Sequence, residues 1–168
     1  MKDNIILIGP PGVGKSTVGV LLAKAMSMPF IDTDIMIQAS EGKRLQDILD
    51  SIGIGAFIEL EEKYILGMDL DHHIIATGGS VIYSYRSMRW LKNSGPAIYL
   101  NLPCNLLMER IHNLDTRGVV KPHGQSFEDL YCERASIYRG YADAEVDCNG
   151  LTHDEAVGTI IETLRGIA

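Results

Sequence analysis

The segment that most constrains the fold is Gly9 to Thr17, GPPGVGKST, which fits the pattern GxxxxGK[ST]. It follows a short run of branched apolar residues, Asn4 to Ile8, and precedes apolar residues at helical spacing up to Met26. Glycines let backbone N–H groups turn toward an anion, and the helix that follows adds its dipole. A plain strand-to-helix turn would explain the glycines but not the Lys-Ser pair.

We therefore predict that this loop binds the phosphates of a nucleoside triphosphate. Lys15 is expected to reach the outer phosphates and Ser16 to offer its hydroxyl to Mg²⁺. The residues expected to contact the nucleotide in this loop are Gly12, Val13, Gly14, Lys15, Ser16 and Thr17.

Short apolar runs recur along the chain at residues 29–32, 73–77, 97–101 and 144–147, with helical patterns between and after them. Alternating short strands and helices indicate an α/β fold in which helices cover both faces of a parallel sheet. With 168 residues, the chain is expected to form a single domain, 1–168.

Composition narrows the class of partner. A formal charge of −7 argues against a nucleic-acid or anionic-membrane surface, which would need a basic patch. The three cysteines have no zinc-ligand spacing and are odd in number, so they are expected to be reduced thiols. The first apolar run is too short for a signal sequence or a membrane span. We expect a cytoplasmic protein with no nucleic-acid or membrane partner.

The second predicted strand ends in Asp32-Thr33-Asp34, at the edge of the sheet where ligands bind in open α/β folds. Asp32 is expected to support the metal, and Asp34 to accept hydrogen bonds from a hydroxyl and take a proton. An aspartate that caps the next helix would explain only one of the pair.

After the third predicted strand comes a second glycine-rich loop, Thr77-Gly78-Gly79-Ser80. Gly78 and Gly79 could bring backbone close to a ligand, or the loop could be an ordinary tight turn. Both readings stay open from the sequence.

Three arginines are candidates for anion contacts. Arg110 precedes an irregular stretch at about 112–125, which we interpret as a lid, and Arg117 lies inside that stretch. A lid arginine can neutralise charge on a phosphoryl group in transfer. Arg139 shares a small-residue stripe with Cys132, Ala135 and Ala142, so it is a candidate anion receptor. Each could instead be a solvated surface charge.

The remaining pattern favours a small-molecule kinase over other phosphate-loop classes. A signalling GTPase would need a later NKxD, which is absent, and the DxxG at 115–118 follows no predicted strand. A nucleic-acid motor would need a larger chain and a basic track.

Together, GPPGVGKST, FIDTD, the Phe57-to-Glu61 helix segment, TGGS, a lid arginine and ERASIY resemble the shikimate kinase family along essentially the whole chain. The resemblance implies a nucleoside-monophosphate-kinase-like fold with a central five-stranded parallel sheet, an acceptor-binding helical region at about 33–66, and a monomer. It implies that the enzyme uses ATP and Mg²⁺ to phosphorylate a hydroxyl of a small polar metabolite, with shikimate as the leading candidate.

The resemblance also implies residue roles. Lys15, Asp34 and Arg117 would be catalytic, and Ser16 and Asp32 would hold the metal. Arg110 would flank the adenine. The substrate would contact Asp34, Gly78, Gly79 and Arg139, with Arg139 gripping its carboxylate.

Two positions depart from the family pattern. Ile58 stands where the family has the arginine of Phe-Arg-x-x-Glu, and Ser80 stands where it has a third glycine. In the family the missing arginine joins the second arginine on the substrate carboxylate, a contact worth about 1.5 to 3 kcal/mol. In the lid, Arg117-Gly118-Val119-Val120 replaces Arg-Pro-Leu.

Two alternatives stay open from the sequence. One is a related kinase of the gluconate or homoserine type, which would make less use of a two-arginine carboxylate clamp. The other is a regulatory module that binds nucleotide without turnover, although Asp32, Asp34 and Arg117 would then have no reason to occur together.

Overall fold

The computed structural model describes residues 2–111 and 118–167, and its centre is a five-stranded parallel sheet of order β2-β3-β1-β4-β5. Ile6 in β1 pairs with Ile75 in β3 and with Ala97 in β4. The strands are β1 (Ile5–Ile8), β2 (Phe30–Asp32), β3 (Ile74–Ala76), β4 (Ala97–Asn101) and β5 (Ala144–Asp147). The predicted fold class, a parallel sheet between helices, is confirmed.

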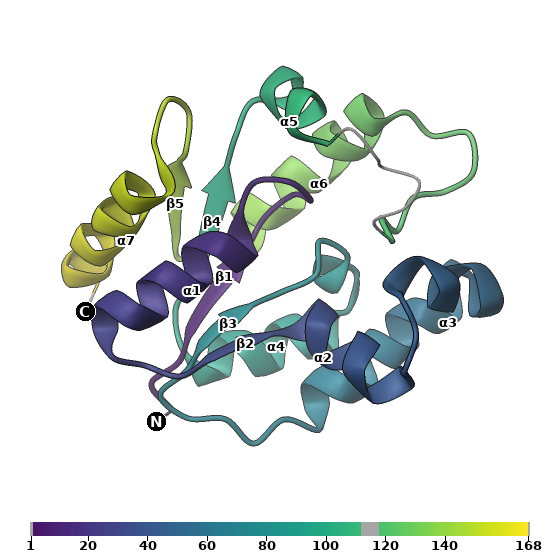
Figure 1. Cartoon of the computed structure of the whole chain (residues 1–168), viewed down its shortest axis with the longest axis horizontal. Helices are drawn as coiled ribbons and strands as arrows, with labels where there is room; N and C mark the ends of the chain where they lie inside the picture. The colour runs from purple at the N-terminus through teal and green to yellow at the C-terminus, as the bar shows by residue number, and fades with distance from the viewer. Residues whose placement is uncertain (1, 112–117, 168) are drawn as a thin grey trace.

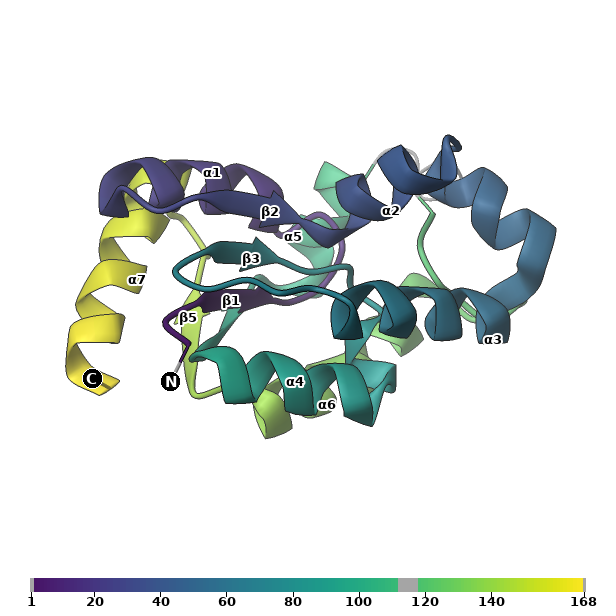
Figure 2. The same cartoon turned by 90° about the horizontal axis from the view of Figure 1, so that it is seen from below.

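Helices cover both faces of this sheet (Figures 1 and 2). In Figure 2, α1 and α7 lie on one side of the strands, and α4 and α6 lie on the other. The helices are α1 (Lys15–Met26), α2 (Thr33–Glu41), α3 (Leu45–Leu66), α4 (Tyr85–Ser94), α5 (Cys104–Arg110), α6 (Phe127–Tyr141) and α7 (His153–Ile167), with a short 3-10 helix at Val81–Tyr83.

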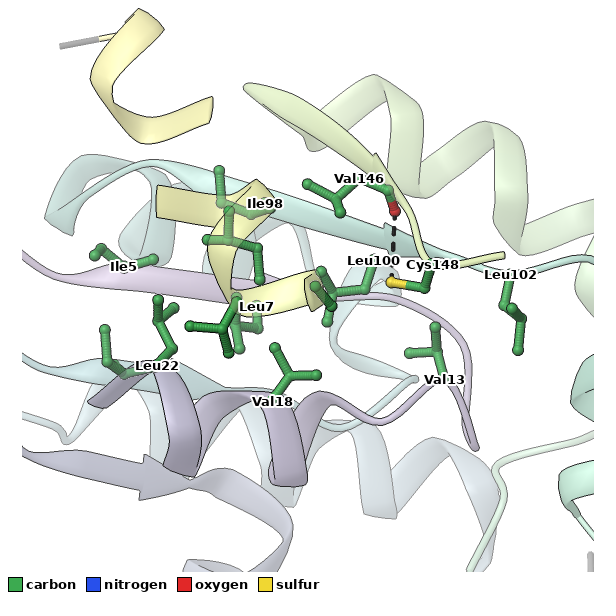
Figure 3. Close-up of a cluster of buried hydrophobic side chains, with 14 of the residues drawn as sticks. Ile5, Leu7, Val13, Val18, Leu22, Ile98, Leu100, Leu102, Val146 and Cys148 are labelled. Atoms are coloured by element: carbon green, nitrogen blue, oxygen red, sulfur yellow. Dashed lines mark hydrogen bonds between the residues drawn. The ribbon is translucent and has the colours of Figure 1, made fainter. Parts of the chain in front are cut away.

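Strand β1 is buried on both faces, and its side chains alternate between two hydrophobic cores. Ile5 and Leu7 pack with residues of α1 and α7 in the cluster drawn in Figure 3. Ile6 and Ile8 pack with residues of α3, α4 and α6 on the opposite face. This explains why β1 reads as continuous apolar sequence rather than as an alternating pattern.

A third, smaller core holds α2 and the first part of α3 together at one end of the molecule. Its members include Ile37, Leu49 and Phe57, and it takes in Val120 from the segment after the predicted lid arginine. Helix α3 is kinked at Gly53, whose φ of 79° and ψ of 168° lie outside the helical region. Within the described residues, none of the helices is both long and apolar enough to cross a membrane.

Candidate active site

The phosphate loop lies between β1 and α1, at the carboxyl edge of the sheet. Gly14 caps α1 with a φ of 108°, a conformation that favours glycine. The Lys15 ammonium folds back over the loop and donates to the carbonyls of Gly9 at 2.7 Å and Pro10 at 2.9 Å. The loop is therefore held in a compact turn by its own lysine.

Lys15 is buried, and this has an electrostatic consequence. Burial lowers the pKa of its ammonium to about 8, while Asp34 and Asp32 oppose that shift. The charged form of a buried lysine is stabilised by nearby negative charge. A polyphosphate bound at this loop would supply that charge.

Asp32 ends β2 and serves two partners at once. Its Oδ1 accepts hydrogen bonds from the backbone N–H groups of Asp34 and Ile35, and so caps α2. Its Oδ2 accepts a hydrogen bond from the Ser16 hydroxyl at 2.6 Å. The helix-cap interpretation is thus correct for Asp32, and it leaves one carboxylate oxygen beside Ser16.

Ser16 and Asp32 offer a hydroxyl and a carboxylate side by side, which are the hard oxygen ligands that Mg²⁺ prefers. The described residues contain no cluster of three or more His, Cys, Asp or Glu that could form a metal cage. Mg²⁺ in phosphoryl-transfer sites usually binds through one or two protein oxygens, substrate phosphates and water. The residues present fit that mode.

Asp34 lies in the first turn of α2 and faces the second glycine-rich loop. A methyl group added at Gly78 would lie 2.5 Å from its Oδ1, so a larger residue there would displace this carboxylate. Burial raises the pKa of the Asp34 carboxyl to about 6, Asp32 adds to the shift, and Lys15 opposes it. At neutral pH the group is therefore an ionised hydrogen-bond acceptor whose proton affinity lies near the working range of a general base.

On the other side of this loop lies a guanidinium that the sequence analysis missed. Arg134 on α6 is 2% exposed, and a methyl group at Gly79 would lie 3.1 Å from its Nη1. Its Nε donates to the Tyr83 hydroxyl at 3.2 Å, and its Nη2 donates to the Val120 carbonyl. Within residues 2–111 and 118–167, no carboxylate lies at ion-pair distance from it.

Arg139 does not lie in this site, contrary to the expectation. Its exposed guanidinium pairs with Glu145 on β5, with Nε 3.0 Å from Oε2. The buried face of α6 carries Arg134 and Tyr138, which are four residues apart. Arg139 is one residue further along and is rotated about 100° from Tyr138. The small-residue stripe that begins at Cys132 does not mark the buried face of α6, because Cys132 itself is exposed.

Glu61 on α3 is a second buried ionisable group near the second glycine-rich loop, residues 77–80, which we call the acceptor loop. It is 1% exposed, and its Oε2 accepts a hydrogen bond from the Ser80 hydroxyl at 2.8 Å. A methyl group at Gly78 would lie 2.6 Å from its Oε1, which has no hydrogen-bond partner among the described residues. Burial raises the pKa of Glu61 to about 8, and Asp34 adds to the shift.

A sequence signal for both buried charges exists. Phe127, Leu130, Arg134 and Tyr138 fall at i, i+3, i+7 and i+11, which places the arginine on an apolar stripe. Phe57, Glu61 and Ile65 are likewise four residues apart and all buried. A charged residue on such a stripe is rarely buried without a role.

Lys15, Ser16, Asp34 and Arg134 border one pocket of about 820 Å³. Of the predicted site residues, those that line it are Gly12, Gly14, Lys15, Ser16, Thr17, Asp34, Gly79 and Arg110. Val13 is packed in the core instead, although its carbonyl accepts a hydrogen bond from Arg110 at 3.4 Å. Gly78 lies directly beside Asp34, and Asp32 reaches the pocket through Ser16. Arg117 lies outside the described residues.

The far end of the pocket is formed by Arg110, the last residue of α5, and by Leu151, Thr152 and His153, at the start of α7. His153 lies close to the phosphate loop, since a methyl group at Gly14 would be 3.3 Å from its Nε2. The pocket therefore extends from this end, past the phosphate loop, to Asp34 and Arg134. It has room for a nucleotide and a small acceptor in line.

Comparison with known proteins shows which family this chain belongs to. The sequence profile of the family described as shikimate kinase matches residues 11–165. The chain belongs to the shikimate kinase family. It is therefore a kinase that transfers a phosphoryl group to an alcohol group, and ATP is the substrate that the family uses as donor. Family membership favours this reading over a nucleotide-binding module without turnover.

Individual members of the shikimate kinase family align along nearly the whole chain. A shikimate kinase of Clostridium botulinum is 35% identical over 161 residues, 95% of this chain and 96% of that protein. One from a Sulfurihydrogenibium species is 31% identical over 163 residues, 96% and 98% of the two chains. The structure of Acinetobacter baumannii shikimate kinase in complex with shikimate superimposes with a TM-score of 0.91 at 27% identity, covering 99% of this chain and 94% of that one.

Proposed function

We propose that this kinase transfers the γ-phosphoryl group of ATP to a hydroxyl of shikimate, with Mg²⁺ as the metal. The observation that carries the proposal is the placement of Asp34 and Arg134 across the acceptor loop from each other, both lining the pocket that Lys15 enters. A carboxylate suits a reacting hydroxyl and a guanidinium suits a carboxylate, and shikimate carries both groups.

On the nucleotide side, Lys15 binds the outer phosphates, and Arg110 flanks the adenine with His153 nearby. The backbone N–H groups of Gly12 to Thr17 cradle the phosphates. Ser16 and Asp32 would hold Mg²⁺, whose chemistry when bound is to neutralise phosphate charge. Arg117 is proposed to act from the lid, residues 112–125, on the transferring phosphoryl group.

On the acceptor side, the helical region 33–66 contributes Asp34. This carboxylate accepts the hydrogen bond of the attacking hydroxyl and takes its proton as the phosphoryl group moves. The Arg134 guanidinium, positioned by Tyr83 and Val120, binds the substrate carboxylate. Gly78 and Gly79 let the acceptor approach the backbone.

The test is a coupled ADP-release assay with ATP, Mg²⁺ and a panel of shikimate, gluconate and homoserine. We expect saturable turnover with shikimate at micromolar to millimolar KM and much slower turnover with the other two. Faster turnover with gluconate or homoserine would reassign the acceptor. ATP binding without acceptor-dependent ADP release would contradict the proposal.

We also infer a monomeric enzyme of the cytoplasm. The thiols of Cys104, Cys132 and Cys148 are all free, as is usual in a reducing compartment. Light scattering of the purified chain measures the oligomeric state directly.

A further inference from the structure

We propose that Ser80 determines acceptor selectivity: its hydroxyl, oriented by Glu61, accepts a hydrogen bond from a hydroxyl of the acceptor. This inference rests on the proposed function and deepens it, since it states which chemical group the site recognises beside Asp34. Ser80 would be a specificity-determining residue that touches the acceptor, and Glu61 a positioning residue that acts through Ser80.

The first step is the direction of the Ser80 hydroxyl. A serine hydroxyl has one proton to donate and two lone pairs that accept. The Ser80 proton is directed to Glu61 Oε2 at 2.8 Å, while Ser80 itself lines the pocket. Toward a ligand the hydroxyl therefore offers lone pairs alone. The matching ligand group is a hydrogen-bond donor, such as a hydroxyl, and a carboxylate oxygen would be repelled.

The second step is the surroundings of Glu61. Position 58, one turn earlier on α3, holds the half-buried Ile58, so no cation is supplied there. The groups that act on Glu61 from neighbouring elements are the Ser80 hydroxyl, the Asp34 carboxylate, the Arg134 guanidinium and the Lys15 ammonium. Of these, Ser80 alone is hydrogen-bonded to it in the described part of the chain. The orientation of Ser80 therefore depends on this one carboxyl group.

The third step is the unpartnered oxygen of Glu61. Glu61 Oε1 is buried with no partner among the described residues, and, like Asp34 Oδ1, it lies close to Gly78. A buried polar atom without a partner in the protein is uncommon, and it suits a hydrogen bond with a bound ligand or water. The polar positions next to Asp34 therefore suit hydroxyl groups, whereas the single guanidinium of Arg134 suits one carboxylate.

The test measures binding by calorimetry in the presence of ADP, with shikimate and with analogues that each lack one ring hydroxyl. We expect Ser80→Ala and Ser80→Gly to bind shikimate about five- to tenfold more weakly than the wild type. They should also lose the wild-type preference for shikimate over one of the deoxy analogues. ADP affinity should stay within twofold, and Ser136→Ala, an exposed serine on α6, is the matched control.

Glu61 variants test the positioning role. Glu61→Gln keeps an oxygen that can accept the Ser80 proton, so shikimate affinity should stay within about twofold of the wild type. Glu61→Leu frees the hydroxyl and should weaken binding as much as Ser80→Ala does, with no further loss in the double variant. Glu59→Leu, an exposed position on the same helix, should have no effect. If Glu61→Leu does not fold, the Ser80 variants decide alone.

The outcomes separate this inference from the proposed function. Unchanged binding of shikimate and every analogue by both Ser80 variants overturns the inference, and ADP release by the wild type leaves the function standing. Ser80-dependent binding without turnover supports the inference and overturns the function. A wild type that does not bind shikimate overturns both.

Discussion

At the scale of single residues, the site gathers ionisable groups whose pKa values are displaced by burial. Burial lowers the pKa of Lys15 to about 8 and raises that of Asp34 to about 6. Each change disfavours the charged form in the absence of a ligand. Bound phosphates would stabilise the ammonium, and an acceptor hydroxyl would give the carboxylate a hydrogen bond. The same desolvation that perturbs these groups strengthens their contacts with substrate.

Asp34→Asn tests the proposed role in proton transfer. An amide does not take the hydroxyl proton, so we expect kcat to fall about 100-fold or more, while ATP affinity changes little. Steady-state kinetics and nucleotide titration measure the two quantities. In the wild type, kcat/KM should decrease as the pH falls through about 6, because Asp34 becomes protonated there. An equal loss of ATP affinity would argue against an acceptor-specific role.

Ile58→Arg tests the departure from the family pattern. Ile58 is half-buried and is not part of the pocket lining or of the three core clusters, so its replacement should be tolerated. A second guanidinium one turn before Glu61 should lower the KM for shikimate about tenfold, by a charge-assisted contact to its carboxylate. Kinetics with shikimate measure this. A lower melting temperature with no gain in KM would mean that Ile58 serves packing.

At the scale of elements, the decisive feature is which face of a helix is buried. On α6 the buried face carries Arg134, whereas the small-residue stripe that pointed to Arg139 lies partly in solvent. Arg134 lies within the segment ERASIY, and Arg139 directly follows it, five positions later. Periodicity could have singled out Arg134, because Phe127, Leu130 and Tyr138 share its spacing. Its contacts with Val120 and Tyr83, on other elements, required the tertiary structure.

Arg134→Gln and Arg139→Gln form a matched pair on this helix. We expect Arg134→Gln to reduce kcat/KM for shikimate about 100-fold, mainly through KM, since it removes the carboxylate partner. Arg139→Gln removes an exposed pair with Glu145, worth at most about 1 kcal/mol of stability, and should leave kinetics unchanged. Steady-state kinetics of both variants check this. A larger loss in Arg139→Gln would restore the original assignment.

At the scale of the whole molecule, the sheet topology collects the site. The phosphate loop follows β1, Asp32 ends β2 and Asp34 follows it, and the acceptor loop follows β3. These three strands are neighbours in the order β2-β3-β1. Parallel neighbours end at the same edge, so residues more than 40 positions apart meet there. Placing carboxyl groups at this buried edge lowers stability in return for function.

Glu61→Gln measures that cost across the pH range. The folded pKa of about 8 exceeds the ordinary value of 4.5, so the folded state keeps a proton that the unfolded chain releases. On Oε1, which has no partner among the described residues, this proton leaves Oε2 free to accept from Ser80. Wild-type stability should therefore decrease as the pH rises from about 4.5 to 8, relative to a variant with no titrating group there. We expect Glu61→Gln to melt several degrees higher at pH 8 and about equally at pH 4.5, by thermal denaturation. A pH-independent difference would contradict the shift.

Much of this protein could be predicted from local pattern. The glycine-rich phosphate loop, each buried strand and the Asp32-Thr33-Asp34 segment each consist of a few consecutive residues. Their chemistry can therefore be recognised from the sequence directly. The fold class and the family followed from these segments and were confirmed. The departure at Ile58 was also visible in the sequence.

The tertiary structure alone decided how distant residues combine. The Ser80–Glu61 hydrogen bond joins positions 19 residues apart. The Arg134 guanidinium on α6 lies beside Gly79, which is far from it in the sequence. Burial and the proximity of other charges set the ionisation of Lys15, Asp34 and Glu61, and both depend on packing between elements. The sequence determined which groups the site contains, and the packing determined which of them face the acceptor.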